Sequence, residues 1–301
     1  MVSRLEKNKK IEKEIKKEVK IEKKEKRKKR NRKFLAFIIS LLIIFFIYSY
    51  FIEPNLLLVN EKVILSSNIK EDLHGIKIVH FSDLHYGSSI NSKNIKKVIN
   101  KINELEPDIV VFTGDLLDIR YTEKYTKKEI DVLTDALKDI NASLGKYSII
   151  GNHDYNYTEL SNIYYDSNFN LLVNKSDIIY GKEGTTIGIY GFDNITYGSP
   201  NIEGLKDNSF NSSNLKIVLL HDYFINNYNI DVILGGHSHN GQVKIPFVRP
   251  IFLPDGAKKY YAPYYKINNA DIYISNGLGE SIFNIRFNNI PSINFYRINK
   301  A

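Results

Sequence analysis

Five short segments of the sequence place side chains of metal-ligand type directly after runs of apolar residues. They are Asp83-Leu84-His85, Gly114-Asp115, Gly151-Asn152-His153-Asp154, His221-Asp222 and Gly235-Gly236-His237-Ser238-His239. The runs that precede them, such as IKIVHFS and DIVVFT, are typical of buried strands. Because ligands gather at the carboxyl ends of strands in open α/β sheets, we expect the five segments to converge on one site.

The residue types and their spacing fit the binding of cations. Asp83 and His85 are two residues apart, so both side chains point to one face of an extended strand end. His237 and His239 repeat this spacing, and the two carboxylate oxygens of Asp115 can bridge two ions. Each segment alone is an ordinary turn pattern. The ordered set of five is what indicates a metal centre.

The rest of the composition narrows the ligand types. The chain of 301 residues has no cysteine, which excludes disulfides and thiolate ligands. Asn152 offers a neutral amide oxygen, which coordinates a cation without adding negative charge. His80 lies inside an apolar run, so we expect a hydrogen-bonded core residue there. Asp154 and Asp222 fit either support for the neighbouring histidines or exposed turns.

The elements that must position these residues alternate between strand and helix. Residues 76–82, 108–113 and 147–150 are predicted strands, and apolar spacing predicts helices over 95–105 and 124–143. Shorter apolar runs predict further strands at 185–190, 215–220, 232–234, 271–275, 283–287 and 292–297. This order predicts one α/β domain with one or two mixed sheets.

The segment that precedes this domain predicts a membrane anchor. Residues 34–52 carry no charge, and a helix of this length just crosses a hydrocarbon core of roughly 30 Å. A buried core helix or a cleaved signal peptide fits less well, because basic residues crowd one end and the small-residue cleavage pattern is missing. We expect a basic cytoplasmic tail at 1–33, a transmembrane helix at 34–52, a linker at 53–63 and a catalytic domain at 64–301.

The positive charge of the chain is concentrated in the tail. The net charge is +8, but residues 1–33 hold 17 Lys and Arg against 6 Glu, which leaves the remainder slightly acidic. The positive-inside rule then places the tail in the cytoplasm and the domain outside the cell membrane. The tail either serves topology alone or lies on the inner leaflet as a helix. Nucleic-acid binding is the weaker reading, because the tail lacks aromatic stacking residues.

The ordered motifs resemble those of the calcineurin-like metallophosphoesterases, and in particular their membrane-anchored bacterial branch. The resemblance runs from about residue 64 to 297 and is carried by FSDLHYG, GNHD, GGHSHNGQVKIPF, ISNGLG and IRFNNIP. It implies an α-β-β-α sandwich of two mixed sheets flanked by helices, preceded here by one transmembrane helix. Asn240 and Asn276 depart from the branch, which commonly has a glycine and a basic residue at these positions.

The resemblance also implies two metal sites and a catalytic residue. Asp83, His85, Asp115 and His239 would bind the first metal, and Asp115, Asn152, His221 and His237 would bind the second, with Asp115 as the bridge. His153 would lie beside the phosphate as a general acid or as a stabiliser of its charge. Mixed histidine and carboxylate sites accept manganese, iron or zinc.

The implied function is two-metal-dependent hydrolysis of phosphate mono- or diesters at the membrane surface, with a metal-bridging hydroxide as the nucleophile. The anchor keeps the site near lipids, so a phospholipid, a lipid-linked nucleotide sugar and a wall polymer are the expected substrates. The alternative is a non-catalytic, membrane-tethered module that binds metal or phosphate. The presence of His153 and of every ligand type favours the enzyme. No nucleic-acid partner is expected, and the sequence leaves the oligomeric state open.

Overall fold

The computed structural model describes residues 4–118, 120, 125–225, 228–250 and 252–301. The chain divides into two compact units, the first ending at Tyr48 and the second running Ser49–Ala301. The first three residues of the predicted tail lie outside the described residues, as does Lys124, where the helix predicted over 124–143 would begin.

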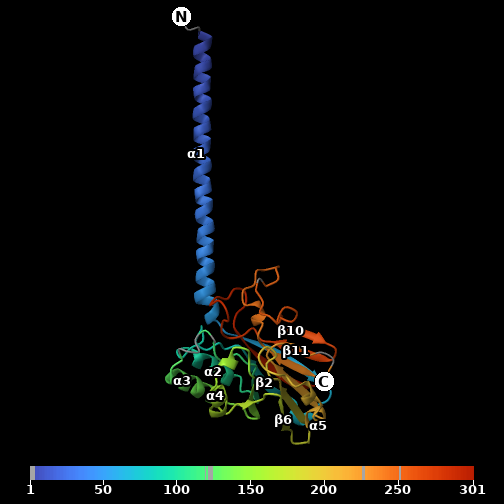
Figure 1. Cartoon of the computed structure of the whole chain (residues 1–301). Helices are drawn as coiled ribbons and strands as arrows, with labels where there is room; N and C mark the ends of the chain where they lie inside the picture. The colour runs from blue at the N-terminus through green and yellow to red at the C-terminus, as the bar shows by residue number, and fades with distance from the viewer. Residues whose placement is uncertain (1–3, 119, 121–124, 226–227, 251) are drawn as a thin grey trace. The chain divides into compact units, whose positions relative to one another are not determined.

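The first unit is the long helix α1 (Arg4–Ile47), drawn in blue in Figure 1. The helix includes the basic tail and most of the apolar segment, whose side chains, such as Phe34 and Ile44, are exposed. A π-helical stretch, Tyr48–Ile52, follows it. In the part of the chain that the structure describes, this is the one helical segment long and apolar enough to cross a membrane, by its length and composition.

The first of two six-stranded sheets in the second unit has the strand order β1-β12-β2-β3-β4-β5. Strands β2 to β5 are parallel, whereas β12 is antiparallel to β2 and parallel to β1. The strands are β1 (Leu58–Ser66), β2 (Ile76–Phe81), β3 (Ile109–Phe112), β4 (Gly145–Ser148), β5 (Asn170–Leu171) and β12 (Ser292–Lys300). The carboxyl ends of β2, β3 and β4 therefore lie at one edge of this sheet.

The second sheet has the order β10-β11-β9-β8-β7-β6. Strands β7, β8, β9 and β11 are parallel, and the edge strands β6 and β10 are antiparallel to their neighbours. The strands are β6 (Lys175–Tyr180), β7 (Thr186–Gly191), β8 (Leu215–Leu220), β9 (Val232–Gly235), β10 (Tyr264–Ile267) and β11 (Ala270–Ile274). Both sheets are thus mixed, as the sequence predicts.

Three apolar clusters separate the layers of this unit. Ile78 of β2 packs in the cluster between the two sheets, while its neighbour Val79 packs under helices on the outer face. In β8, Ile217 faces the central cluster and Val218 faces the outer cluster of the second sheet. Because both faces of these strands are buried, their sequences read as continuous apolar runs rather than as alternating ones.

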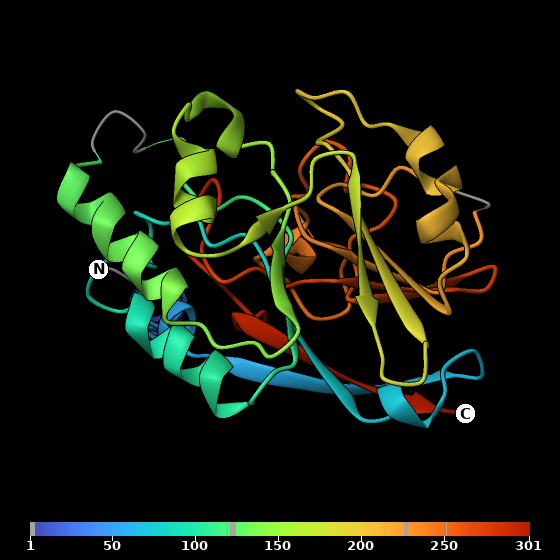
Figure 2. The same ribbon diagram turned by 90° about the horizontal axis from the view of Figure 1, so that it is seen from below.

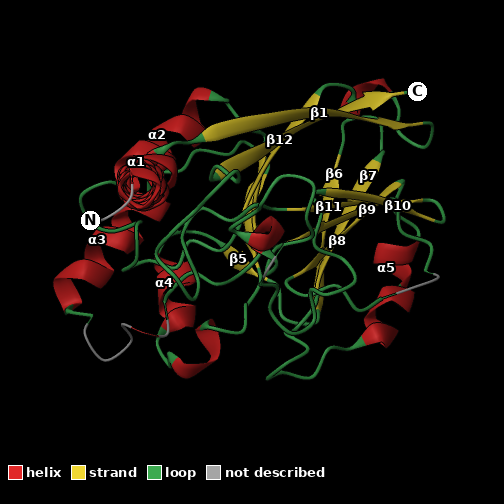
Figure 3. Ribbon diagram, turned by 90° about the horizontal axis from the view of Figure 1, so that it is seen from above, coloured by secondary structure: helices red, strands yellow, loops and turns green. Residues whose placement is uncertain are grey.

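Helices cover the outer face of each sheet. The helices α2 (Ile95–Glu104), α3 (Lys127–Lys138) and α4 (Leu160–Asp166) pack on the first sheet, and α5 (Asn208–Asn211) packs on the second. Figures 2 and 3 show both sheets between these two sets of helices. Short 3-10 helices occupy Glu53–Asn55, Glu71–Leu73, Asp154–Asn156, Ile202–Lys206 and His239–Gly241. The predicted α-β-β-α sandwich is confirmed.

The strand predicted at 283–287 is wrong, because the side chain of Gln242 and the backbone of Ser49 bond to groups that a strand would pair. Nε2 of Gln242 donates to the carbonyl oxygens of Phe283 (2.7 Å) and Ile285 (3.0 Å). The backbone N–H of Arg286 donates to the carbonyl of Ser49 (2.9 Å). Only an isolated bridge at Phe287 remains of the predicted pairing.

The segment predicted as a linker, 53–63, folds with the domain. Its second half belongs to β1, which pairs along its whole length with β12. In its first half, the buried carboxylate of Glu53 accepts hydrogen bonds from the backbone N–H groups of Asn288 and Asn289. These contacts attach the start of the second unit to the loop that precedes β12.

Candidate metal centre

The five motif segments follow neighbouring parallel strands and meet at their carboxyl ends. Asp83, Asp115, Asn152, His221 and His237 follow β2, β3, β4, β8 and β9 in that order. The loops are joined across the two sheets, since the backbone N–H of His237 donates to Oδ1 of Asp83 (2.9 Å). Within the first sheet, the N–H of Asp83 donates to the carbonyl of Gly114 (2.9 Å). The structure therefore brings all five segments together.

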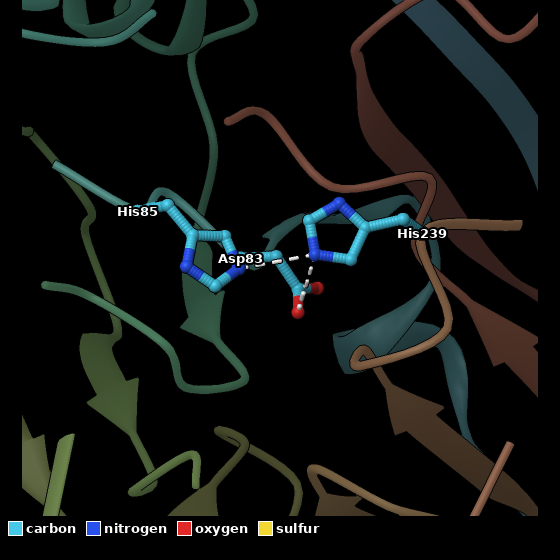
Figure 4. A group of neighbouring side chains, drawn as sticks. All are labelled: Asp83, His85 and His239. Atoms are coloured by element: carbon cyan, nitrogen blue, oxygen red, sulfur yellow. Dashed lines mark hydrogen bonds and ion pairs between the residues drawn. The ribbon is translucent and has the colours of Figure 1, made fainter. Parts of the chain in front are cut away.

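Asp83, His85 and His239 form a first group of buried side chains (Figure 4). Nε2 of His85 lies 3.0 Å from Nε2 of His239, which in turn lies 3.5 Å from Oδ1 of Asp83. Burial lowers the pKa of both histidines well below the ordinary value, so both rings are neutral. Two neutral imidazole nitrogens and a carboxylate oxygen at these separations could hold one divalent cation.

Asp115, His221 and His237 form a second group. Nδ1 of His221 donates to the carbonyl of Thr113 (2.7 Å), which leaves Nε2 facing Oδ2 of Asp115 at 3.3 Å. Burial opposes charge on this ring, but Asp115 and its neighbouring carboxylates raise the pKa of His221 well above the ordinary value. The space around Nε2 thus attracts a positive charge, which either a proton or a metal cation can supply.

Two further contacts extend the second group. Oδ1 of Asn152 lies 3.1 Å from Nε2 of His221. Nε2 of His237 donates to the carbonyl of Asp255 (2.7 Å), which orients the ring, and its Nδ1 lies 3.0 Å from Oδ1 of Asp222. Asp222 is buried beside this ring rather than part of an exposed turn.

Asp115 lies between the two groups. Its Oδ2 is 3.6 Å from Nε2 of His85 in the first group and 3.3 Å from Nε2 of His221 in the second. Its Oδ1 accepts a hydrogen bond from the backbone N–H of His153 (2.8 Å), which fixes the carboxylate plane. One carboxylate is therefore available to ions in both groups.

The electrostatics of the site fit cations. Burial raises the pKa of Asp83 to about 7, and the negative charge of Asp115 adds to this rise while His221 opposes it. Carboxylates in such a site are stable as anions only when a positive charge compensates them. Neutral imidazoles, an amide oxygen and two buried carboxylates are a donor set for divalent transition metals, which supply this charge.

His153 lies beside the first group. Its ring is 4.7 Å from the ring of His85 and nearly perpendicular to it. Its ring is partly exposed, and its Nδ1 has no hydrogen-bond partner. A ligand-type atom of His153 also lies within 4.8 Å of such atoms in His85 and the buried Asp118. Sequence reasoning missed Asp118, although it follows Asp115 by three residues in the same loop.

The backbone at the site is strained. Asp83, His85, Asp115, His237 and His239 all have positive φ, between 41° and 65°. This left-handed conformation is uncommon for residues other than glycine, although Asn, Asp and His adopt it more often than other types, and it persists only where the surroundings enforce it. The five residues share it because each directs a side chain from the end of a strand into the same small volume.

Asp154 holds the loop that carries Asp115. Its buried carboxylate accepts hydrogen bonds from the backbone N–H groups of Asp115 (2.8 Å), Leu116 (2.8 Å) and Gly151 (2.9 Å). Burial raises its pKa to about 7, and the charge of Asp115 adds to the rise. The sequence left open whether Asp154 is an exposed turn residue, and the structure shows that it is a buried support for Asp115.

The motif segments lie within a part of the chain that matches the sequence model of a known family. The sequence model of the family described as calcineurin-like phosphoesterase matches residues 76–241, which is more than half of the chain. The chain belongs to the calcineurin-like phosphoesterase family. It is therefore a metal-dependent hydrolase of phosphoesters, and the two groups above are candidate sites for the divalent metals that this family uses.

Two sequence relatives agree with this assignment. The chain is 32% identical to the metallophosphoesterase YkuE of Bacillus subtilis over 83% of this chain and 88% of YkuE. It is 26% identical to the UDP-2,3-diacylglucosamine pyrophosphatase LpxG of Chlamydia muridarum over 71% of this chain and 78% of LpxG. A solved dimetal phosphatase from Danio rerio aligns at 9% identity with a TM-score of 0.43, covering 68% of this chain and 88% of that one.

Two residues near the phosphoesterase site have structural roles. His80 is buried, its Nε2 lies 2.9 Å from Oγ1 of Thr113, and burial lowers its pKa to about 3. This confirms the predicted core histidine. Arg286, which lies outside the matched segment, is fully buried and donates to the carbonyls of Asn276 (3.0 Å) and Gly277 (3.1 Å). Its guanidinium therefore fixes loops around the site.

Proposed function

We propose that the chain hydrolyses phosphate monoesters or diesters with two divalent cations held at these groups. Asp83, His85, Asp115 and His239 would hold one cation, and Asp115, Asn152, His221 and His237 would hold the other. The observation that carries the proposal is the position of Asp115, whose Oδ2 lies within 3.6 Å of a histidine nitrogen from each group. A carboxylate shared in this way is the usual bridge of a two-metal centre.

The chain's own residues would have distinct roles in this reaction. When bound, the two cations supply a water of lowered pKa and neutralise the phosphate oxygens. Burial keeps His85 and His239 neutral and able to coordinate. His153 would hold a proton for the leaving oxygen, a role supported by its partial exposure beside His85. General acid catalysis of this kind contributes about 10²–10⁴ in rate.

The test of this function compares Asp115→Asn with the unaltered protein. The full-length chain, in lipid nanodiscs, is assayed with p-nitrophenyl phosphate and bis-p-nitrophenyl phosphate at fixed manganese or zinc. We expect metal-dependent hydrolysis that a chelator abolishes and that Asp115→Asn reduces by at least 10²-fold, as for loss of a major electrostatic group. Asp131→Asn, an exposed position on α3, is the matched control.

Two outcomes would contradict this function. Equal rates for the protein and Asp115→Asn would exclude the two-metal mechanism. Metal binding without any hydrolysis of either ester would instead favour the non-catalytic, metal-binding module as the function of the domain.

The proposal also covers the substrate class and the side of the membrane on which the enzyme acts. We infer that the substrate is a phosphoester at the outer face of the cell membrane. It would be a phospholipid, a lipid-linked nucleotide sugar or a wall polymer. The support is the apolar stretch of α1, the excess of basic residues before it, and the name of the relative LpxG, which acts on a diacylated sugar nucleotide. The LpxG name favours the lipid-linked substrates among the three.

The orientation can be tested on intact cells. The positive-inside rule predicts that a protease added outside removes the domain, while an epitope at the amino terminus stays protected. Permeabilised cells provide the control for access. A domain that survives external protease until the cells are permeabilised would reverse the orientation.

A further inference from the structure

An apolar pocket of about 190 Å³ adjoins the metal centre. His237 and His239, one proposed ligand of each cation, form part of its wall. The apolar part of the wall consists of Val243, Phe252, Pro254, Ile282, Phe283 and Ile285. An occupant of this pocket would therefore lie next to a phosphate at the metal centre.

The residues that line the pocket do not fit a charged group of a ligand. The described residues that line the pocket include no Asp, Glu, Lys or Arg. Three of its apolar side chains are exposed although they are large, namely Phe252 (46%), Ile282 (47%) and Phe283 (59%). Exposed apolar side chains gathered around a concave site usually mark a binding surface for an apolar ligand.

Hydrogen bonds hold the two sides of the pocket together. Gln242 comes from one side, and its Nε2 donates to the carbonyls of Phe283 (2.7 Å) and Ile285 (3.0 Å) on the other. Its Oε1 accepts from the backbone N–H of Ser281 (3.1 Å). The pocket is therefore a formed cavity between two fixed segments rather than a gap between independent loops.

The pocket wall is also connected to the start of the domain. The N–H of Arg286, which follows the wall residue Ile285, donates to the carbonyl of Ser49 (2.9 Å). Ser49 lies within residues 34–52, the predicted transmembrane segment, so this wall is bonded to the chain where it leaves that segment. Ser49 and the pocket wall both belong to the second unit.

We propose that this pocket binds the hydrocarbon chain of a lipid phosphoester while the phosphate lies at the metal centre. The proposal rests on the proposed function and names its substrate class. A lipid substrate explains an uncharged pocket that shares two histidines with a site for phosphate. A wall polymer, which is polar along its length, would leave these apolar side chains in water.

The experiment uses a series of n-alkyl phosphates, from ethyl to octyl, as competitors of p-nitrophenyl phosphate hydrolysis by the full-length protein in nanodiscs. If the pocket takes the chain, the inhibition constant falls by up to about fourfold for each added methylene group until the pocket is full. For each protein, the inhibition constants of the alkyl phosphates are divided by that of inorganic phosphate. In the double variant Phe252→Ser with Ile282→Ser, this ratio should change much less with chain length than in the unaltered protein. Tyr165→Ser, an exposed aromatic position on α4, should retain the dependence of the unaltered protein.

A second readout does not depend on hydrolysis. An octyl phosphate with a diazirine at its chain end should cross-link to residues 252–254 and 281–285, and dodecyl phosphate should compete with it. A flat chain-length dependence in the unaltered protein, the same slope in the double variant, or cross-links confined to residues 34–52 would each overturn the proposal. If hydrolysis is absent altogether, the proposed function fails, and the cross-linking alone then decides whether the pocket binds hydrocarbon.

Discussion

At the residue scale, the metal centre consists of donor atoms that face one another in a buried space. The nitrogens of His85 and His239 are 3.0 Å apart, and both rings are neutral because they are buried. Nε2 of His221 faces a carboxylate oxygen in the same way. A cation at either position would replace the proton that these contacts share, so metal binding competes with protonation in this site.

His153 offers a direct test of the residue roles. We expect His153→Gln to lower kcat by about 10²–10⁴-fold, because glutamine cannot donate an acidic proton to a leaving oxygen. The bound metal should stay at two ions per chain, since no proposed ligand is removed. Kinetics and elemental analysis of the same preparation measure both quantities. A loss of metal that accompanies the loss of rate would instead make His153 a ligand.

His80 predicts a pH dependence of stability. Burial lowers its pKa from 6.5 to about 3 in the folded protein, so below pH 6.5 the unfolded chain binds a proton that the folded chain does not. The stability that the neutral ring provides is present above pH 6.5 and falls, by up to about 1.4 kcal/mol per pH unit, as the pH drops towards 3.

The comparison uses His80→Gln, which retains a hydrogen-bonding group beside Thr113 but does not titrate. Thermal unfolding of both proteins at pH 7.5, 6 and 5 should show a smaller decrease in Tm for the variant. Parallel decreases in the two proteins would mean that the buried ring contributes nothing to acid sensitivity.

The sequence was sufficient to predict which residues form the site, but not the hydrogen bonds that hold them in place. Asp83, His237 and the other motif residues were found because each follows an apolar run. Asp118 and the role of Asp154 were not predictable, because a carboxylate in a loop has the same local pattern whether it is exposed or accepts three backbone N–H groups. The positive φ angles were also not predictable, since most Asp and His residues have negative φ.

At the element scale, central strands were predicted better than edge strands. The strand predicted at 215–220 matches β8, which is buried on both faces. In contrast, β1, β6 and β10 were missed, because each has exposed residues and its apolar side chains stand beside charged or polar ones. The strand predicted at 283–287 failed for the opposite reason. Its apolar residues line a pocket instead of pairing in a sheet.

The segment 49–55 belongs energetically to the domain, and Glu53 tests this. Its buried carboxylate accepts hydrogen bonds from the N–H groups of Asn288 and Asn289. We expect Glu53→Ala to lower the free energy of unfolding by about 1–3 kcal/mol, because two buried donors lose their partner. Thermal unfolding of the full-length protein measures the change.

The matched control is Glu61→Ala in β1. Glu61 pairs with Arg297 at 2.8 Å, but both side chains are about half exposed, and such surface pairs contribute only about 0–1 kcal/mol. Equal losses of stability in the two variants would show that Glu53 does not attach the segment to the domain.

At the scale of the whole molecule, charge and polarity divide the chain into parts with different surroundings. The basic residues are concentrated in the first unit, together with the exposed apolar stretch of α1, whereas the second unit is nearly neutral and contains every proposed ligand. The second unit adds an apolar pocket beside those ligands. This distribution fits a hydrolase that works on phosphate groups carried by lipids.

A crystal structure of the manganese-loaded protein would show whether two cations share Asp115. We expect two anomalous scattering peaks about 3.5–4 Å apart, both within coordination distance of the Asp115 carboxylate. The same crystals of Asp115→Asn should lose at least one peak. A single peak in the unaltered protein, or two peaks of which one does not contact Asp115, would exclude Asp115 as a bridge between two cations.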